Sequence, residues 1–279
     1  MSESKQRWRL IFRRDESAMY LSHLDAIHAW ERGLRRGRIP VALSEGFNPR
    51  PKLAFAAPLQ LGMLAEHELA DLYLAERLAA PDLRARLAGC LPPGYVVTDL
   101  HDVWVGEAAI APQLAAADYR ATVIGVDVDR LRPAIARLLG ADTLPRERRR
   151  EKGTTRYDLR PLILDLRCAD PTATQRHAAN AGEEPGAGPA AALWMRLRHS
   201  QDGGTGRLEE VVAALAEELR LRFAWMGTDD TDHAHPQAEC AAPVARDTGN
   251  ELDVFMPVRE RLWLATELTP TTPKAPATV

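Results

Sequence analysis

The chain has 279 residues, of which 46% are hydrophobic and 27% are charged, and its formal net charge is −3. This length allows two domains, and the composition is that of a globular protein rather than a disordered or fibrous one. A polar N-terminus and the lack of a long apolar run predict a cytoplasmic protein without a membrane span. Cys90, Cys168 and Cys240 lie far apart, which argues against a disulfide framework and a CxxC metal site.

Charge is distributed unevenly along the chain. Lys and Arg outnumber Asp and Glu in residues 1–60 and 119–170, and the reverse holds in residues 61–118 and 171–279. If the basic blocks gather on one surface, they attract a polyanion even though the net charge is slightly negative. The charge pattern alone does not identify that polyanion.

The N-terminal part of the chain reads as a βαββαβ series. WRLIF (8–12) alternates apolar and cationic residues, as a half-buried strand does, and Ser22 followed by Asp25 resembles the capping box of a helix at 23–36. The later elements are extended segments at 39–43, 52–59 and 67–76, a helix at 81–90 and a strand at 95–105. This order is the ferredoxin-like arrangement.

A similar series follows a connector at 107–117. Its elements are a strand at 119–126, a helix at 129–139 that contains Pro133, a segment at 157–168, a strand at 194–199, an amphipathic helix at 207–221 and a closing strand at 222–227. The predicted fold class is α+β, with tandem ferredoxin-like (βαββαβ) units and antiparallel sheets. We expect domains at 1–106 and 118–255, the second with a mobile loop at 171–190, and a partly disordered tail at 256–279.

Cations near the end of the first helix are one candidate phosphate-binding surface. Arg32, Arg35 and Arg36 lie three or four residues apart, and Arg38 follows them. The competing interpretation is that these side chains complement the helix dipole and keep the protein soluble.

The loop GFNPRPK (46–52) is a second candidate. Its two prolines restrict the backbone, and Gly46 permits a tight turn. Such a loop presents a fixed set of side chains, namely Phe47, Asn48, Arg50 and Lys52. An ordinary turn between strands is the alternative.

The segment PRERRREKGTTRYDLRP (145–161) is a third candidate. As a hairpin or flexible loop it would place cations along a sugar-phosphate backbone, with Tyr157 free to stack on a base. The cations are Arg148, Arg149, Arg150, Lys152 and Arg156. A solvated loop with Glu147 and Glu151 as internal partners is the alternative.

His23 and Asp25 are the candidate catalytic residues. His23 opens the first helix, where the positive end of the dipole favours a neutral imidazole that can act as a base. A structural histidine beside a helix cap, with Asp25 as part of that cap, is the competing interpretation. TDDTDHAH (228–235) resembles no structural zinc pattern, so we predict neither a metal nor a cofactor.

Several motifs together resemble a radical-SAM-linked family of uncharacterised bacterial proteins. They are WRLIFRR, YLSHLD, WERGLRRGRIPVALSEGFNPRPKLAFAAPL and DLRPLI, and the resemblance covers residues 7–105 and, more loosely, 119–250. ARDTGN (245–250) resembles the family's C-terminal Arg-Thr motif, but Asp247 departs from it and puts a role for Arg246 in doubt. The resemblance implies a domain fused to, or encoded beside, a radical SAM enzyme with a cobalamin-type domain.

The chain lacks the CxxxCxxC motif that holds the iron–sulfur cluster of such an enzyme. We therefore predict a non-catalytic accessory protein that binds structured RNA, such as tRNA or rRNA, for a separately encoded radical SAM partner. The βαββαβ pair with a helix histidine also resembles CRISPR repeat-processing endoribonucleases, which implies a metal-independent nuclease with His23 as general base. A protein–protein adaptor without RNA binding is the third hypothesis.

Overall fold

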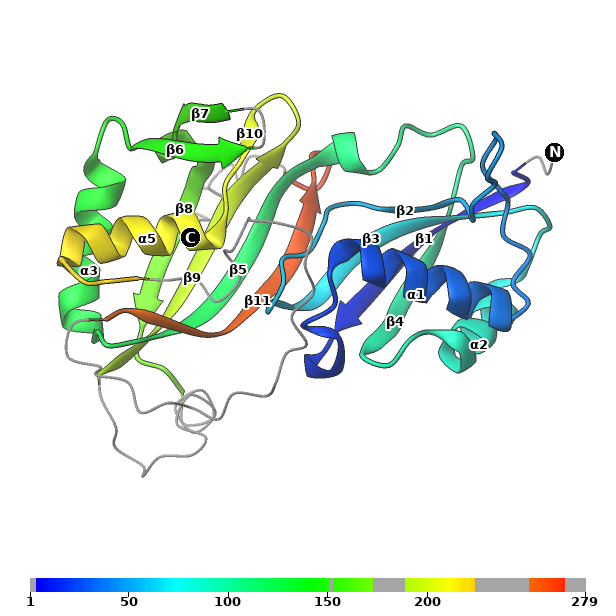
Figure 1. The fold of residues 1–279 in the computed structure, drawn as a ribbon, viewed down its shortest axis with the longest axis horizontal. Helices are drawn as coiled ribbons and strands as arrows, with labels where there is room; N and C mark the ends of the chain where they lie inside the picture. The colour runs from blue at the N-terminus through cyan, green and yellow to red at the C-terminus, as the bar shows by residue number, and fades with distance from the viewer. Residues whose placement is uncertain (1–3, 151–152, 173–188, 224–250, 269–279) are drawn as a thin grey trace, which may run out of the picture.

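The computed structural model describes residues 4–150, 153–172, 189–223 and 251–268. Over these residues the chain forms a nine-stranded, mostly antiparallel sheet, a separate two-stranded hairpin and four α-helices. Figure 1 shows helices in front of the sheet on both halves of the molecule. The predicted mixture of helices with extensive antiparallel pairing is confirmed. None of the described helices has the length and apolar character needed to cross a membrane.

The first half of the structure follows the βαββαβ order. Its elements are β1 (Gln6–Arg14), α1 (His23–Arg36), β2 (Leu53–Phe55), β3 (Leu64–Leu74), α2 (Ala80–Cys90) and β4 (Tyr95–Val103). The strands are ordered β4-β1-β3, and β2 pairs with the other edge of β3. Leu10 of β1 lies between Leu100 and Ala70, and this face of the sheet packs on Trp30 of α1 and Leu83 of α2.

Helix α1 has the bounds that the sequence predicts, because its N-terminus is capped locally. The Ser22 hydroxyl accepts a hydrogen bond from the Asp25 backbone N–H at 3.2 Å and donates one to the Asp25 carboxylate at 2.7 Å. Further along α1, Gly33 permits a close approach to α2, since a Cβ there would lie 2.4 Å from the carbonyl oxygen of Cys90. The glycine therefore sets the separation of the two helices.

The second half begins with β5 (Leu114–Ile124), so the expected connector is shorter than predicted. The other elements are α3 (Val128–Gly140), β6 (Pro145–Arg150), β7 (Gly153–Asp158), β8 (Ile163–Ala169), β9 (Ala190–Ser200), β10 (Gly204–Thr205), α5 (Leu208–Leu219) and β11 (Asp253–Leu264). Strands β11, β5 and β9 are adjacent in that order, and both β8 and β10 pair with β9. Helix α3 continues through Pro133, and β6 and β7 form the separate hairpin.

Strand β11 joins the two halves of the sheet. It runs antiparallel to β5 and parallel to β3, where Val258 lies opposite Leu64 and Arg259 opposite Ala65. The predicted closing strand at 222–227 lies mostly outside the described residues; of its described part, Arg222 forms an isolated bridge with Glu251, and the strand beside β5 is β11. Strand β11 continues to Leu264, past residue 256, where the predicted tail begins.

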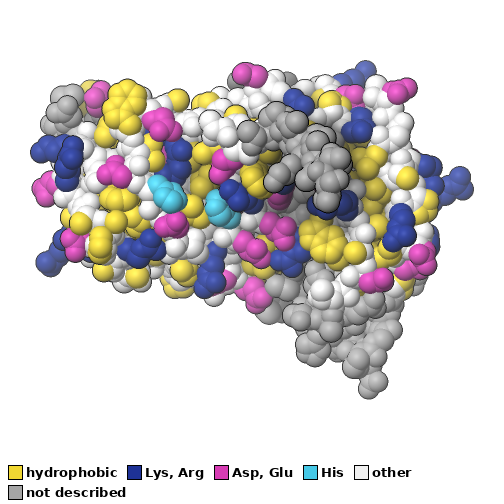
Figure 2. All heavy atoms as spheres, turned by 180° about the vertical axis from the view of Figure 1, so that it is seen from behind, with side chains coloured by type: hydrophobic (Ala, Val, Ile, Leu, Met, Phe, Trp, Pro, Cys, Tyr) yellow, Lys and Arg dark blue, Asp and Glu magenta, His cyan; other side chains and the backbone are white. Residues whose placement is uncertain are grey.

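The face of the sheet opposite the helices carries paired charges. Arg196 of β9 bonds Asp118 of β5 at 2.6 Å, and Arg120 of β5 bonds Glu260 of β11 at the same distance. Figure 2 shows Lys and Arg side chains interspersed with Asp and Glu side chains over the described part of this face. The basic side chains on it therefore form no continuous cationic stripe.

Candidate nucleic-acid interface and the His23 pocket

The loop between Leu43 and Pro51, which we call the 43–51 loop, is fixed at its base. Leu43 and Pro51 form an antiparallel bridge, the Ser44 N–H donates to the Arg50 carbonyl at 2.8 Å, and the Arg50 N–H donates to the Ser44 hydroxyl at 3.0 Å. Beyond the loop, the Tyr73 N–H of β3 donates to the Lys52 carbonyl at 3.1 Å. The loop is therefore attached to the main sheet.

The tip of the 43–51 loop presents the side chains that the sequence singles out. Phe47 is fully exposed, at 107% of its reference area, and Asn48 and Arg50 are exposed as well. Gly46 has a φ of 119°, a conformation that favours glycine. Lys52 follows at the base and is half-buried.

The arginines of α1 lie at the same end of the first half. Arg32, Arg35 and Arg36 are exposed, and Arg32 and Arg35 have no side-chain partner among the described residues, whereas Arg36 donates to the Cys90 carbonyl at 3.1 Å. Arg38 is exposed, with a φ of 49°. We call this region the outer end: Figure 1 shows the end of α1, the 43–51 loop and the N-terminus there, away from β11.

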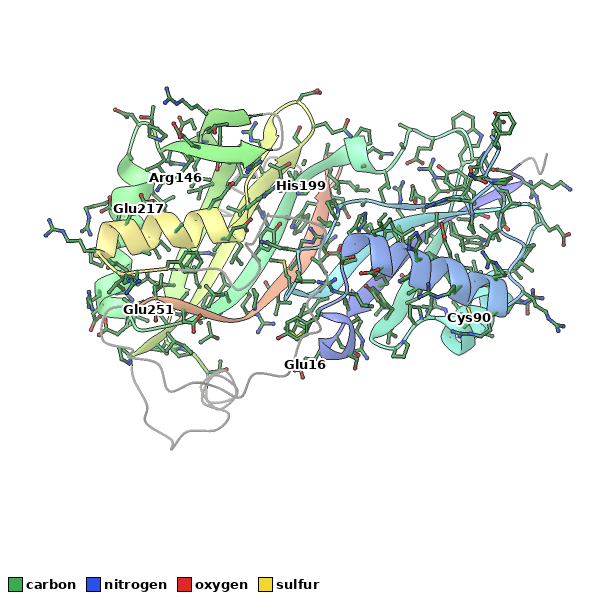
Figure 3. The ribbon with its side chains drawn as sticks, in the orientation of Figure 1. Glu16, Cys90, Arg146, His199, Glu217 and Glu251 are labelled. Atoms are coloured by element: carbon green, nitrogen blue, oxygen red, sulfur yellow. The ribbon has the colours of Figure 1, made fainter. Side chains whose placement is uncertain are left out.

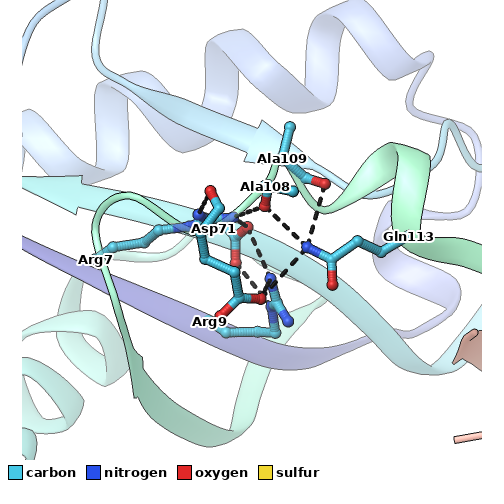
Figure 4. Close-up of polar contacts among 7 residues, drawn as sticks. Arg7, Arg9, Asp71, Ala108, Ala109 and Gln113 are labelled. Carbon is cyan, nitrogen blue, oxygen red and sulfur yellow. Dashed lines mark hydrogen bonds and ion pairs between the residues drawn. The ribbon is translucent and has the colours of Figure 1, made fainter. Parts of the chain in front are cut away.

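The connection after β4 is held against the same half by a buried charge network, drawn in Figure 4. Arg7 and Asp71 are fully buried and ion-paired, and Arg9 bonds Asp71 at 3.0 Å. Arg7 also donates to the carbonyls of Glu107 at 2.6 Å and Ala108 at 2.9 Å. The backbone of this connection is therefore fixed relative to β1.

The basic segment 145–158 forms a hairpin, one of the two predicted conformations, but three of its arginines have acidic partners. Arg148 bonds Glu210 of α5 at 2.9 Å and lies 4.9 Å from the centre of the half-buried Tyr157 ring. Arg156 pairs with Glu147 across the hairpin at 2.6 Å. Arg146 pairs with Glu217 of α5 at 2.9 Å, and Figure 3 shows these two side chains close together.

The structure describes less of the remaining hairpin cations. Arg149 and Arg150 belong to β6, and Lys152 lies outside the described residues. The TDDTDHAH segment, Cys240 and Arg246 also lie outside them. Within the described part of the chain, no group of three or more His, Cys, Asp or Glu side chains is arranged to hold a metal.

His23 lines a pocket at the other end of the first half, near β11. The pocket has an empty volume of about 290 Å³, including space open to solvent. Its polar side chains are Arg14, His23, Glu68 and Tyr95, and its apolar lining is Phe12, Ala26, Phe55, Ala57 and Leu59. Sequence reasoning identified His23 but missed the other polar residues, because strands distant in sequence bring them together.

Burial and nearby charges favour the neutral form of His23 by lowering its pKa. Its partial burial lowers the pKa of the imidazole, and the positive charges of Arg259 and Arg14 lower it further. Asp25 bonds Ser22 in the cap and has no hydrogen bond with His23. The structure thus assigns Asp25 to capping and places His23, whose pKa is lowered, in a pocket.

Buried charges behind the pocket connect the two halves. The Arg259 guanidinium donates to both carboxylate oxygens of Glu68, one at 2.6 Å, and both side chains are 3% exposed. Arg14 donates to the carbonyls of Met63 at 3.1 Å and Gln60 at 2.7 Å. Burial, with the charge of Arg259, lowers the pKa of His199, labelled on β9 in Figure 3, to about 4.

Comparisons with known proteins identify a family without an assigned activity. A search of curated proteins found no match. The family model described as "Uncharacterized protein conserved in bacteria (DUF2344)" matches residues 7–189, which is more than half of the chain. This match includes α1, the 43–51 loop, the residues that line the His23 pocket, and the basic hairpin. It does not include Arg259, which lies behind the pocket. The chain therefore belongs to this family of uncharacterized bacterial proteins.

Proposed function

We propose that the protein is a non-catalytic accessory subunit that binds structured RNA for a separately encoded radical SAM enzyme in the cytoplasm. The observation that carries this proposal is the 43–51 loop, which combines a fixed base, a fully exposed Phe47 and the cationic Arg50, with Lys52 directly after it. A fixed loop that presents a ring and cations suits RNA, because RNA is recognised through unstacked bases together with its phosphates.

The arginines of α1 extend this surface. Arg32 and Arg35 are exposed and have no acidic partner in the described structure, so an external phosphate does not have to displace one. Arginine is well suited to this role, because its planar guanidinium group can bond a phosphate through two N–H groups. Arg32 and Arg35 at the outer end are therefore cations without an ion pair in the described structure.

RNA affinity measured over a series of salt concentrations tests this proposal. Replacement of Arg35, Arg36, Arg50 and Lys52 together by alanine should weaken binding to a similar degree for all RNA sequences. The slope of log affinity against log salt should decrease by roughly 0.7 for each phosphate that the variant no longer neutralises.

A matched control replaces four exposed arginines that already have acidic partners: Arg84, Arg137, Arg156 and Arg167. This variant loses the same formal charge and should keep most of the salt slope. The RNA proposal fails if the purified protein shows no salt-sensitive affinity for RNA, or if the control loses as much affinity as the outer-end variant.

The proposed enzyme partner is supported by the motif resemblance and by the lack of CxxxCxxC in the chain. A tagged copy should retain a radical SAM enzyme during purification. Retention that survives nuclease treatment but disappears in the arginine variant would instead favour the adaptor hypothesis, in which the same surface contacts protein.

A second candidate function is metal-independent RNA cleavage, and the His23 pocket favours it. The lowered pKa of His23 favours its base form, and the buried Arg14 and Tyr95 line the same pocket, where a cation and a hydroxyl can stabilise a phosphorane. The products should carry 2′,3′-cyclic phosphates, form in EDTA and disappear in His23→Ala. RNA that stays intact after prolonged incubation would eliminate this candidate.

We also propose that the two halves are tandem ferredoxin-like units. Support comes from the strand orders, since β4-β1-β3-β2 in the first half matches β11-β5-β9-β8 in the second when β6, β7 and β10 are set aside. The domain boundaries predicted from the sequence stay predictions. Limited proteolysis that releases a stable fragment near residue 106 would support them.

A further inference from the structure

Two large aromatic side chains at the outer end are strongly exposed. Phe47 in the 43–51 loop is 107% exposed, and Trp104, directly after β4, is 76% exposed. An isolated exposed aromatic ring needs no explanation, but two on connections at the same end of a domain are a candidate contact surface. Trp104 has no role in the fold comparable to that of Trp30, which is fully buried between α1 and the sheet.

The strand register places both rings at the same end. Val103, the last residue of β4, lies opposite Arg7 at the start of β1, and Arg7 lies opposite Tyr73 near the end of β3. The 43–51 loop joins β3 at this position, through the hydrogen bond between Tyr73 and Lys52. Figure 1 shows both connections at the outer end.

Trp104 is held in place before any ligand binds. Its carbonyl accepts from the Glu107 N–H at 3.0 Å, which closes a turn, and the Arg7 network of Figure 4 fixes the chain at Glu107 and Ala108. The indole ring lies over Gly106, where a Cβ would come within 2.6 Å of a ring carbon. The ring is therefore supported on one side by backbone and open to solvent on the rest of its surface.

The side chains around the rings are charged and polar rather than continuously apolar. In the 43–51 loop, Phe47 lies between the exposed residues Glu45 and Arg50, and Arg35 is exposed at the nearby end of α1. Exposed Asp102 and Glu107 lie close to Trp104 in the chain. Isolated rings among charged side chains differ from a protein-docking patch, which has a continuous apolar centre. They match the composition of surfaces that bind single-stranded nucleic acid, in which aromatic rings stack on bases and cations follow the backbone.

We infer that Phe47 and Trp104 form a stacking platform for unpaired bases, so that the RNA segment bound at the outer end is single-stranded. This inference rests on the proposed RNA binding and specifies its substrate class. Paired bases present only their edges, so a duplex cannot place its base faces on the two rings. Stacking is tolerant of sequence, because every base has a π-face.

The test measures affinity of the full chain for an unstructured single-stranded oligonucleotide and for the matching duplex. Phe47→Ala and Trp104→Ala should each weaken single-strand binding by about tenfold. Their salt slopes should stay at the wild-type value, because no cation is removed. Phe47→Tyr and Trp104→Phe should retain most of the affinity, since each keeps a ring.

Tyr20→Ala is the matched control, because Tyr20 is 68% exposed but follows β1 near the His23 pocket, at the opposite end of the first half. It should bind RNA like the wild type, and all variants should keep the wild-type unfolding temperature. The inference is overturned, with the RNA proposal intact, if alanine at both rings leaves salt-sensitive RNA binding unchanged or if the duplex binds as tightly as the single strand.

Two further outcomes also overturn it. If the ring variants lose the radical SAM partner but not RNA, the rings bind protein instead. If neither probe binds at any salt concentration and a structured RNA such as tRNA does not bind either, the platform and the proposed function fail together.

Discussion

The β6–β7 hairpin and the outer end are both rich in cations, but the two regions differ in whether those cations form ion pairs. In the hairpin, Arg148 and Arg146 pair with acidic residues of α5, and Arg156 pairs with Glu147. At the outer end, Arg32 and Arg35 have no such partner within the described chain. The number of basic residues in a segment therefore measures its charge, but not the charge that is available to a ligand.

The sequence does not reveal the pairing of Arg148, because its acidic partner is far away along the chain. Glu210 follows Arg148 by 62 positions, so a local inspection of the basic segment does not include it. Pairing with a partly buried carboxylate removes an arginine from competition for phosphate, because a ligand must then replace a charge-assisted hydrogen bond. Variants of both kinds of cation test this difference.

The largest expected effect concerns Arg259, which is buried in an ion pair with Glu68. Arg259→Met should lower the free energy of unfolding by about 3–5 kcal/mol, because Glu68 is left as an uncompensated buried charge. Denaturant unfolding measures this loss. The double variant Arg259→Met with Glu68→Leu should recover part of it, and a double variant no more stable than the single would contradict the ion-pair explanation.

The second-largest expected effect is a pH dependence of the unfolding free energy, which comes from His199 near the Arg259–Glu68 pair. The folded state lowers the pKa of His199 from 6.5 to about 4, so between these values the unfolded state binds more protons. The contribution of His199 to the free energy of unfolding is therefore fully present above pH 6.5. It is lost as the pH falls towards 4, and the loss is about 3 kcal/mol at most. His199→Asn should flatten the profile between these limits; an unchanged profile would contradict the assignment.

Arg148→Ala should cost about 1–3 kcal/mol of unfolding free energy, because Glu210 loses its partner in a partly buried site. Arg50→Ala, at the exposed loop, should change stability by less than about 0.5 kcal/mol. Thermal unfolding of both variants compares the two regions directly. Equal losses would show that the structural distinction between them is incorrect.

The smallest effect comes from freeing a cation in the hairpin. Glu147→Gln removes the partner of Arg156, and since both side chains are exposed, stability should change by only about 0–1 kcal/mol. If RNA binding depends on free cations, the salt slope should rise by up to about 0.7. A rise in affinity without a change in slope would point to another cause.

Local signals in the sequence were sufficient for several elements. Ser22 and Asp25 fix the start of α1, so the helix at 23–36 was predicted with its observed bounds. The proline-rich 43–51 loop was also recognisable, because its restriction lies in adjacent residues. Elements whose place depends on distant partners were not: β11 lies beside β5 and β3, and no short-range pattern distinguishes it from the segment at 222–227.

The candidate sites follow the same rule. His23 and the outer-end cations could be found by residue type and spacing, whereas Arg14, Glu68 and Tyr95 reach the His23 pocket from β1, β3 and β4. Trp104 had no sequence signal at all, because its exposure depends on the connection that Arg7 and Asp71 hold in place. The exposure of a side chain, and the side chain with which it pairs, are set only when the chain is folded.

The position of β11 has a consequence for how the protein is made. A ribosome releases β3 and β5 long before it releases the strand that lies between them, so both edges stay unpaired while more than a hundred residues are synthesised. Unpaired edges template association with other chains. The nascent protein is therefore most vulnerable just before β11 emerges, and a fragment ending at residue 189, where the family match stops, would keep that vulnerability permanently.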